Sequence, residues 1–513
     1  MAKASKNKRD TRKYLVSTRE WQESHPSGVV CESDIYYSRL ATRIANEIGP
    51  VICEIDGMTD EDIKALAIEL AAYLEDKVSG INLWNAFIGL YREKFHREYP
   101  FYDIEGEEMF ADEPNMPDVR FIVWNAINRS MDTMILNPLN DVTEQLAADM
   151  FDILVEEFET APESQELVDA LYTPANYADM LYLRGVCGWI SARAYLTAAV
   201  DFENAFEAIY KVINTCFGDD IPERACFYAI ETYAYMNVTV GPLALCPCQW
   251  LGKMMELSED PEIKALAPKV KDIESLTLLP YEIKSVSADG FDVRSVVDTI
   301  IHVSFDTLPD GMAEQVKAGN VMIASLFRYD GIWHINGLAT FSSSPNGIDD
   351  SVKKYKEKKE NEVRSRNFQI DRNGGSPIGV AADWNEISRR FDFDKAKQSS
   401  ENLVKDDKDF LYFINSDGAM TILPDCAGLV DISGNPFYSP EKSTKEGAAL
   451  LLRDDASMEL CEYLVDNNLL PDARLVGPGF PNDEARRWFA QNSLFLSKMY
   501  HTEIAQFKFP KVD

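Results

Sequence analysis

The sequence predicts a multidomain α+β protein with a mainly helical N-terminal half, a small barrel-like β module and an α+β C-terminal domain. Apolar residues recur at helical spacing through residues 14–265, and short β-rich runs separated by turn residues follow over 278–345. Mixed patterns fill residues 373–513. The chain has 513 residues, of which 46% are hydrophobic, so it has enough apolar surface for several cores.

The first helices of the N-terminal half are marked by apolar stripes and by end signals. The stripe over residues 34–47 is expected to end at Gly49-Pro50, because glycine favours helix ends and proline cannot continue a helix. Thr59 is expected to cap the next helix, since its hydroxyl can accept a free N–H group of the first turn. Asn82 is expected to cap a third helix in the same way.

Later helical patterns are predicted in the same half of the chain. They cover residues 141–159, 177–199 and 222–236. Asp201 precedes a further apolar stripe that runs to Ile213 and predicts one more helix. The helices within residues 177–240 resemble one tetratricopeptide-type hairpin, but an ordinary helical bundle is favoured because no pattern recurs at a fixed period.

The polar stretch Phe101–Asp118 lies between two of these helices and is dense in carboxylates. Asp103, Glu105 and Glu107 take alternate positions, as ligands do in a calcium loop. Glu108, however, stands where such a loop needs glycine. A solvated acidic loop is therefore favoured over a calcium site.

Short β-type runs mark the β module at residues 278–345. The strands are predicted at 281–286, 291–297, 299–305, 321–329 and 332–338. Asp330-Gly331 between the last two is a strong hairpin signal. So many short strands in so short a stretch indicate a small barrel or a rolled sheet.

A charged segment and a mixed region complete the chain. Residues 351–372 are predicted to form a solvated connector helix with some i,i+4 ion pairs, and a cationic docking strip is the alternative. In the region 373–513, Phe410–Ile414 and Met420–Leu423 are expected to form a hairpin. Ser457 is expected to cap a helix that follows.

Short phrases rich in aromatic residues are spread along nearly the whole chain. They are Asp34-Ile35-Tyr36-Tyr37, Tyr73-Leu74-Glu75-Asp76 with Ser79-Gly80 and Trp84, Pro100-Phe101-Tyr102-Asp103, Asp118-Val119-Arg120-Phe121-Ile122-Val123-Trp124, Asn435-Pro436-Phe437-Tyr438 and Leu469-Leu470-Pro471-Asp472-Ala473. Together they resemble a bacterial family classed as a domain of unknown function. The resemblance implies a whole-chain architecture found in bacteria and no assigned activity.

The net charge of the chain limits which kinds of partner it can bind. Lysine and arginine number 51 against 85 aspartates and glutamates, a net charge of −34 at pH 7. Residues 1–13 are the basic exception and are expected to be a disordered tail. Because an acidic surface repels polyanions, nucleic acid is disfavoured, and a protein partner, possibly a basic one, is expected.

Targeting signals and the number of cysteines indicate the cellular compartment in which the protein is expected. No run of apolar residues approaches the length needed to cross a bilayer, and the basic N-terminus lacks the apolar run of a signal peptide. Nine cysteines are scattered along the chain, which favours a reducing compartment and structural thiols. A cytoplasmic protein without membrane contact is therefore expected.

No known catalytic or cofactor motif appears in the sequence. The zinc-protease, phosphate-loop, dinucleotide and nucleophile-elbow signatures are absent, so no catalytic residue, cofactor or metal is predicted. None of the five histidines is at ligand spacing from another: His25, His96, His302, His334 and His501. Cys246-Pro247-Cys248 lacks a second ligand pair nearby, and structural thiols are favoured over a zinc site there.

Two functional hypotheses follow from the sequence. The favoured hypothesis is a non-enzymatic protein-interaction or scaffold protein. The alternative is an enzyme of unrecognised type with a site between the β module and the C-terminal domain, where His302, His334, Asp330 and Asp417 lie near predicted strand ends.

Three tryptophans of the helical half are open to two interpretations. Trp84, Trp124 and Trp189 lie within apolar helical patterns, so burial in the core is favoured. A place on a partner surface is the alternative, because tryptophan often dominates binding energy at interfaces.

Overall fold

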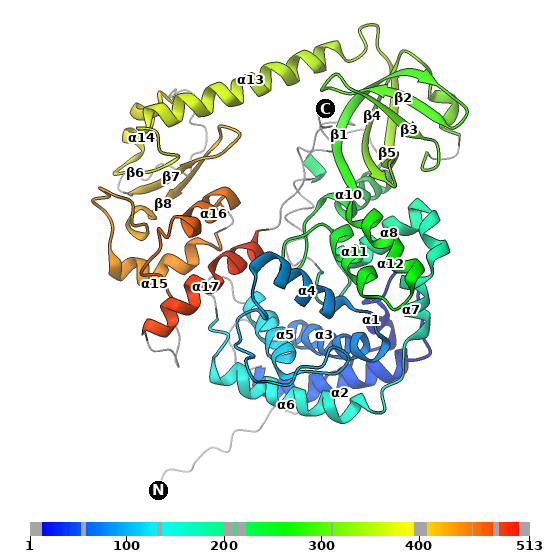
Figure 1. Ribbon diagram of the computed structural model, residues 1–513, viewed down its shortest axis with the longest axis vertical. Helices are drawn as coiled ribbons and strands as arrows, with labels where there is room; N and C mark the ends of the chain where they lie inside the picture. The colour runs from blue at the N-terminus through cyan, green and yellow to red at the C-terminus, as the bar shows by residue number, and fades with distance from the viewer. Residues whose placement is uncertain are drawn as a thin grey trace. The chain divides into compact units, whose positions relative to one another are not determined.

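The computed structural model of the chain describes residues 13–52, 58–130, 136–198, 209–211, 213, 222–308, 311–393, 408–453, 455–475 and 482–501. The chain divides into two compact units, one of Met1–Ser275 with Phe327–Gly331 and one of Leu276–Leu326 with Ile332–Asp513. The predicted fold class is confirmed: a mainly helical N-terminal region precedes a closed barrel and mixed α/β elements (Figure 1). Nearly all of the tail 1–13, and most of the helix expected after Asp201, lie outside the described residues.

The first unit is built from α-helices that pack in neighbouring pairs. Its helices are α1 (Thr18–Gln22), α2 (Asp34–Ile52), α3 (Asp60–Ser79), α4 (Leu83–Phe95), α5 (Met116–Arg129), α6 (Asp141–Phe158), α7 (Gln165–Tyr172), α8 (Met180–Ala192), α10 (Glu223–Asn237), α11 (Pro247–Leu257) and α12 (Pro261–Lys271). Helix α2 packs on α3, α5 on α6, α8 on α10, and α11 on both α4 and α12. Each helix buries its apolar stripe against its neighbours.

Helix α2 is longer than its sequence predicts. It continues through Gly49 and Pro50 to Ile52, where an end at Gly49-Pro50 is expected. Gly49 is buried against the ring of Tyr14, so closely that a Cβ atom there would collide with the ring. The glycine therefore serves close packing in this helix and does not end it.

The capping predictions for the next two helices have different outcomes. Thr59 caps α3 as predicted: its Oγ1 accepts the N–H of Asp62 at 3.2 Å, and the Asp62 carboxylate accepts the Thr59 N–H at 2.8 Å. The prediction for Asn82 was wrong, because its side chain makes no cap bond to α4. The carboxylate of Asp76 on α3 takes that place.

The single helix predicted over residues 177–199 is also wrong. Tyr177 lies in a short 3₁₀ helix, Pro174–Ala178, and α8 begins only at Met180. The carboxylate of Asp179 accepts the N–H of Leu181 at 2.8 Å and thus starts a new helix.

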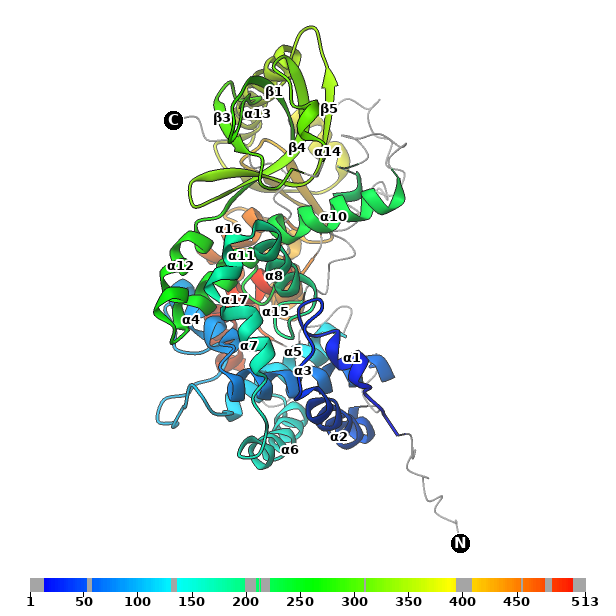
Figure 2. The ribbon, with the colours of Figure 1, turned by 90° about the vertical axis from the view of Figure 1, so that its right-hand side faces the viewer.

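Within the described residues, the β module forms a closed five-stranded barrel in the order β1-β2-β3-β5-β4. Figure 2 shows strands β1, β3, β4 and β5 of this barrel. The strands are β1 (Glu274–Val286), β2 (Gly290–Arg294), β3 (Ile300–Ser304), β4 (Asn320–Tyr329) and β5 (Ile332–Ser343). Strands β1 and β3 pair antiparallel with β2, whereas β3 pairs parallel with β5. Fully buried side chains such as Tyr281, Phe291 and Ile335 pack into one apolar cluster. The barrel is therefore a packed core.

Mixed elements follow the barrel in the second unit. They are α13 (Asp349–Arg372), β6 (Ile378–Ala381), α14 (Trp384–Phe391), β7 (Phe410–Ile414), β8 (Met420–Pro424), α15 (Pro440–Leu450), α16 (Met458–Asp466) and α17 (Asn482–Tyr500). The predicted hairpin is confirmed as β7–β8, and β6 joins its β7 edge in an antiparallel sheet. Ser457 caps α16 as predicted, with its Oγ accepting the Leu460 N–H at 3.3 Å.

Candidate functional site

Helix α3 carries three consecutive charged residues that are buried. Glu75, Asp76 and Lys77 have exposed fractions of 2%, 3% and 6%. Charged side chains are rarely buried unless they are paired or hydrogen-bonded. These three take part in two separate polar networks, one around Asp118 and one around His25.

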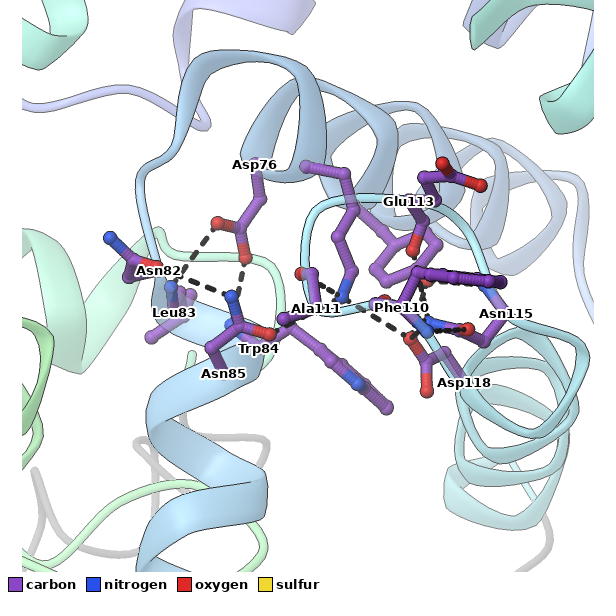
Figure 3. A network of polar contacts seen from close by, with 12 residues as sticks. Asp76, Asn82, Leu83, Trp84, Asn85, Phe110, Ala111, Glu113, Asn115 and Asp118 are labelled. Atoms are coloured by element: carbon purple, nitrogen blue, oxygen red, sulfur yellow. Dashed lines mark hydrogen bonds and ion pairs between the residues drawn. The ribbon is translucent and has the colours of Figure 1, made fainter. Parts of the chain in front are cut away.

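Asp76 connects the end of α3 to the start of α4 (Figure 3). Its carboxylate accepts the N–H groups of Leu83 at 3.2 Å and Trp84 at 2.8 Å, and the hydroxyl of Tyr195 at 2.8 Å. Burial raises the pKa of Asp76, while these hydrogen bonds favour the ionised form. The free N–H groups of the first turn of α4 thus have their acceptor on another helix.

Lys77 crosses to the loop before α5. Its Nζ donates to the carbonyl of Ala111 at 2.9 Å and to Asn85 Oδ1 at 3.3 Å, and it lies 3.5 Å from Asp118 Oδ2. Figure 3 shows Ala111 on this loop, facing the start of α5. The buried ammonium therefore has both hydrogen bonds and a charge partner, which offset its desolvation.

Asp118 completes this network on α5. Its carboxylate accepts the hydroxyls of Tyr73 and Tyr99, each at 2.6 Å, and the Asn115 amide at 3.2 Å. Burial raises the pKa of both tyrosines well above its ordinary value, and the negative charge of Asp118 adds to the rise. The network ties α3, α4 and α5 together and leaves the Asp118 carboxylate fully engaged.

The second network surrounds His25, in the segment between α1 and α2. Nε2 of His25 lies 3.0 Å from Glu75 Oε2. On the other edge of the ring, Nδ1 lies 4.0 Å from Cys31 Sγ and 3.6 Å from Asp34 Oδ1. His25 and Asp34 are each 2% exposed, and Cys31 is 5% exposed.

Hydrogen bonds fix the two carboxylates of this second network. Asp34 Oδ2 accepts the N–H of Cys31 at 3.0 Å and the side-chain amide of Gln22 at 2.6 Å. Asp34 Oδ1 is buried and accepts no hydrogen bond. Glu75 Oε1 accepts the hydroxyl of Ser164.

The electrostatics of the second network favour a cation. Burial lowers the pKa of His25, but the hydrogen bonds to Cys31 and Glu75 outweigh burial and raise it to about 10. One nitrogen, one sulfur and one oxygen, from His25, Cys31 and Asp34, lie within 4.8 Å of one another. Among the described residues, this is the set that could hold a metal ion.

The exposed surface of α6 and α7 is acidic. Between residues 130 and 183 the chain has no lysine or arginine. We call the exposed carboxylates between residues 141 and 169 the acidic face: Asp141, Glu144, Asp149, Asp152, Glu156, Glu159, Glu163, Glu166, Asp169. Arg43 pairs with Glu156, and Arg120 pairs with Glu144. The other carboxylates of the acidic face have no ion pair to a described residue.

The histidines predicted on the β module have separate partners. His302 is exposed, and its Nδ1 lies 2.8 Å from Asp292 Oδ1. His334 is 3% exposed, and burial lowers its pKa, with Asp306 acting in the opposite direction. Neither belongs to the cluster of metal-ligand atoms found among the described residues.

The two aspartates predicted beside these histidines lie in turns. Asp330, between β4 and β5, forms an ion pair of 2.6 Å with Lys269. Asp417, between β7 and β8, accepts the N–H of Ala419 at 2.8 Å. Asp330 therefore joins its turn to α12, whereas Asp417 serves the local structure of its own turn.

The cysteines and tryptophans singled out by the sequence are mostly buried. Cys248 is buried and Cys246 partly buried, and neither is in a disulfide. Trp84, Trp124 and Trp189 have exposed fractions of 1%, 0% and 5%, so burial in the core is confirmed for all three. The alternative, a partner surface built on these tryptophans, is wrong.

Sequence reasoning missed the second network because it compared histidines only with one another. A signal was present: His25, Cys31 and Asp34 form the pattern His-x₅-Cys-x₂-Asp. That spacing matches no established metal motif. The role of Glu75 has no local signal, since it lies 50 residues from His25.

Comparisons with known proteins point to one family. A family model described as a protein of unknown function matches residues 16–285. No curated protein matches the chain, and no solved structure matches it. Among the described residues, no helix is both long and apolar enough to cross a membrane. Both buried networks and the acidic face lie within the matched residues.

Proposed function

The chain belongs to the DUF3843 family, and we propose that this member is a non-enzymatic interaction protein that binds a basic protein partner. The acidic face on α6 and α7 carries this proposal. Its carboxylates recur through two consecutive helices with no lysine or arginine among them. Such a surface attracts a basic protein and repels nucleic acid.

The acidic face is suited to contact because most of its charge is uncompensated. Arg43 and Arg120 compensate only Glu144, Glu156 and the neighbouring Glu157 within the described residues. Each remaining carboxylate can form an exposed ion pair, and such a pair contributes up to about 1 kcal/mol. Several pairs together would steer a basic partner and set its orientation.

The alternative, an enzyme with a site between the β module and the C-terminal domain, needs His302, His334, Asp330 and Asp417 to act together. The contacts described for these residues involve other partners: His302 with Asp292, Asp330 with Lys269 and Asp417 with Ala419, while His334 is buried. We therefore propose binding in place of catalysis for this protein.

A charge-matched pair of variants tests the proposal on the full chain. The first combines Asp152→Asn, Glu159→Gln and Glu163→Gln on the acidic face. The second combines Glu314→Gln, Asp350→Asn and Glu446→Gln, which are exposed carboxylates elsewhere. Binding of a fluorescent oligolysine peptide is followed by anisotropy over a series of salt concentrations.

The acidic-face variant is expected to bind the peptide about tenfold more weakly and with a shallower salt dependence, because three exposed ion pairs are lost. The second variant should bind within twofold of the wild type. Equal weakening in both variants would mean that net charge alone attracts the peptide, and it would overturn the proposal.

A further inference from the structure

We propose that His25, Cys31 and Asp34 form a buried structural site for a divalent transition metal, with Zn²⁺ the best-suited ion. The ligand atoms are Nδ1, Sγ and Oδ1, and all lie within 4.8 Å of one another. With zinc bonds of about 2.0–2.3 Å, tetrahedral ligands are separated by about 3.3–3.8 Å. The two distances from Nδ1, 4.0 Å to Sγ and 3.6 Å to Oδ1, would contract by a few tenths of an ångström on binding, and Sγ and the carboxylate oxygen would close from a separation of at most 4.8 Å.

The buried carboxylate of Asp34 is an independent reason to expect a cation. Its side chain is 2% exposed, and Oδ1 accepts no hydrogen bond. The other oxygen is held by Gln22 and by the backbone of Cys31, so Oδ1 is turned toward His25. A buried oxygen without a hydrogen bond is costly, and a bound metal ion would satisfy it.

The surroundings of His25 match those of a metal-bound imidazole. Such a histidine usually gives its second N–H group to a carboxylate, which fixes the ring and makes the ligand nitrogen more basic. Glu75 lies 3.0 Å from Nε2 in this position, and Ser164 holds Glu75 in turn. Trp21 packs edge-on against the imidazole at 5.5 Å and is fully buried.

The donor set selects the metal. Calcium and magnesium prefer oxygen ligands, whereas a thiolate with an imidazole favours zinc and its transition-metal neighbours. A metal ion binds the thiolate of Cys31 and the neutral imidazole of His25, so binding would release the protons that these ligands carry.

Burial gives the site a structural role. His25 and Cys31 lie in the segment that joins α1 to α2, Asp34 is the first residue of α2, and Glu75 belongs to α3. A metal ion there would fasten this segment to α3. Three protein ligands leave one tetrahedral position, which a buried water would fill.

The test uses the purified full chain, freed of metal with a chelator and titrated with Co²⁺ or Zn²⁺. Cobalt bound to a thiolate gives a charge-transfer absorption band that reports the sulfur ligand directly. Zinc content is measured by mass spectrometry of the metal, and X-ray absorption identifies the bound atoms. About one metal ion per chain, with one sulfur at about 2.3 Å, is expected.

Three variants separate this site from other thiols. Cys31→Ser should abolish the charge-transfer band, and Glu75→Gln should lower zinc affinity on the order of 10- to 100-fold by releasing His25. Cys246→Ser is the matched control, because that thiol is more accessible and lies outside the cluster; it should leave the band unchanged.

Three outcomes would overturn the proposal. One is a wild-type chain that binds neither ion at micromolar concentration, which would leave a proton as the cation on His25. Another is a band that survives Cys31→Ser or disappears in Cys246→Ser. The third is an X-ray absorption spectrum of the metal-loaded wild type that shows no sulfur bound to the metal. This measurement needs no variant, so it tests the proposal even if Cys31→Ser fails to fold.

Discussion

At the scale of single residues, the surroundings decide the chemistry of each side chain. His25 is buried among Cys31, Asp34 and Glu75, and its pKa is raised to about 10. Burial lowers the pKa of His334 too, and there the opposing charge of Asp306 does not outweigh it. The difference arises because His25 has hydrogen bonds to Cys31 and Glu75 that favour the imidazolium.

Glu20 at the start of the fold makes stability depend on pH. Its carboxylate accepts hydrogen bonds from Ser17 and from Lys64, and these lower its pKa from 4.5 to about 2. A lowered pKa means that the ionised form stabilises the folded state. This contribution is complete above about pH 4.5 and is lost as the pH falls toward 2.

We therefore expect Glu20→Gln to lower the free energy of unfolding at pH 7 by about 1 kcal/mol, because Glu20 is partly exposed and the capping box of α1 is weakened. The deficit should shrink as the pH falls below 4.5. Urea unfolding of both proteins from pH 7 to pH 3.5 measures it, and a constant difference would contradict the assignment.

At the scale of secondary structure, α3 organises the first unit. One turn of this helix sends Glu75 toward the segment between α1 and α2, Asp76 toward α4, and Lys77 toward α5. The apolar stripe of α3 packs against the neighbouring helices. The three charged residues determine which element lies next to each face of α3, because each needs a specific partner. Loss of these contacts from α3 is therefore expected to destabilise the neighbouring helices.

Substitutions of Asp76 test whether α3 positions its neighbours. Asp76→Ala removes the acceptor of two backbone N–H groups and of the Tyr195 hydroxyl, so we expect a loss of about 3 kcal/mol in stability. Asp76→Asn keeps one acceptor oxygen and should lose less. Chemical denaturation gives both values, and hydrogen exchange should report faster opening of α4 in the alanine variant. Equal stability of wild type and alanine variant would contradict the role.

At the scale of the whole molecule, the large net negative charge is expected to govern how stability depends on salt. A net charge of −34 makes the folded chain repel itself, and the repulsion weakens when salt shortens the screening length to about 10 Å at 0.1 M. The many ion pairs on the surface contribute little each, so their loss in salt is a smaller effect.

We expect the melting temperature to rise by about 2–5 °C between low salt and 0.2 M NaCl, because screening relieves self-repulsion. The acidic-face variant carries three fewer negative charges and should show a smaller rise. Differential scanning calorimetry measures both proteins. A melting temperature that is unchanged or falls with salt would show that self-repulsion does not limit stability.

Much of the fold is predictable because its signals are local. The β-type runs and the Asp330-Gly331 turn predict the barrel. The Phe410–Ile414 run predicts the separate β7–β8 hairpin of the mixed region. The errors have different causes. Gly49 serves close packing against Tyr14 within α2, Asp76 replaces Asn82 as the cap of α4, and Asp179 starts a new helix within the range 177–199.

The sequence by itself determined the order of the helical region, the barrel and the mixed region, and the acidity of the chain, because periodicity, turn residues and charge are properties of neighbouring residues. Only the tertiary structure decided which polar residues meet. His25 faces Glu75, and Lys77 faces Asp118, across dozens of residues. Such pairs form when helices pack, and no spacing in one segment records the surface of another.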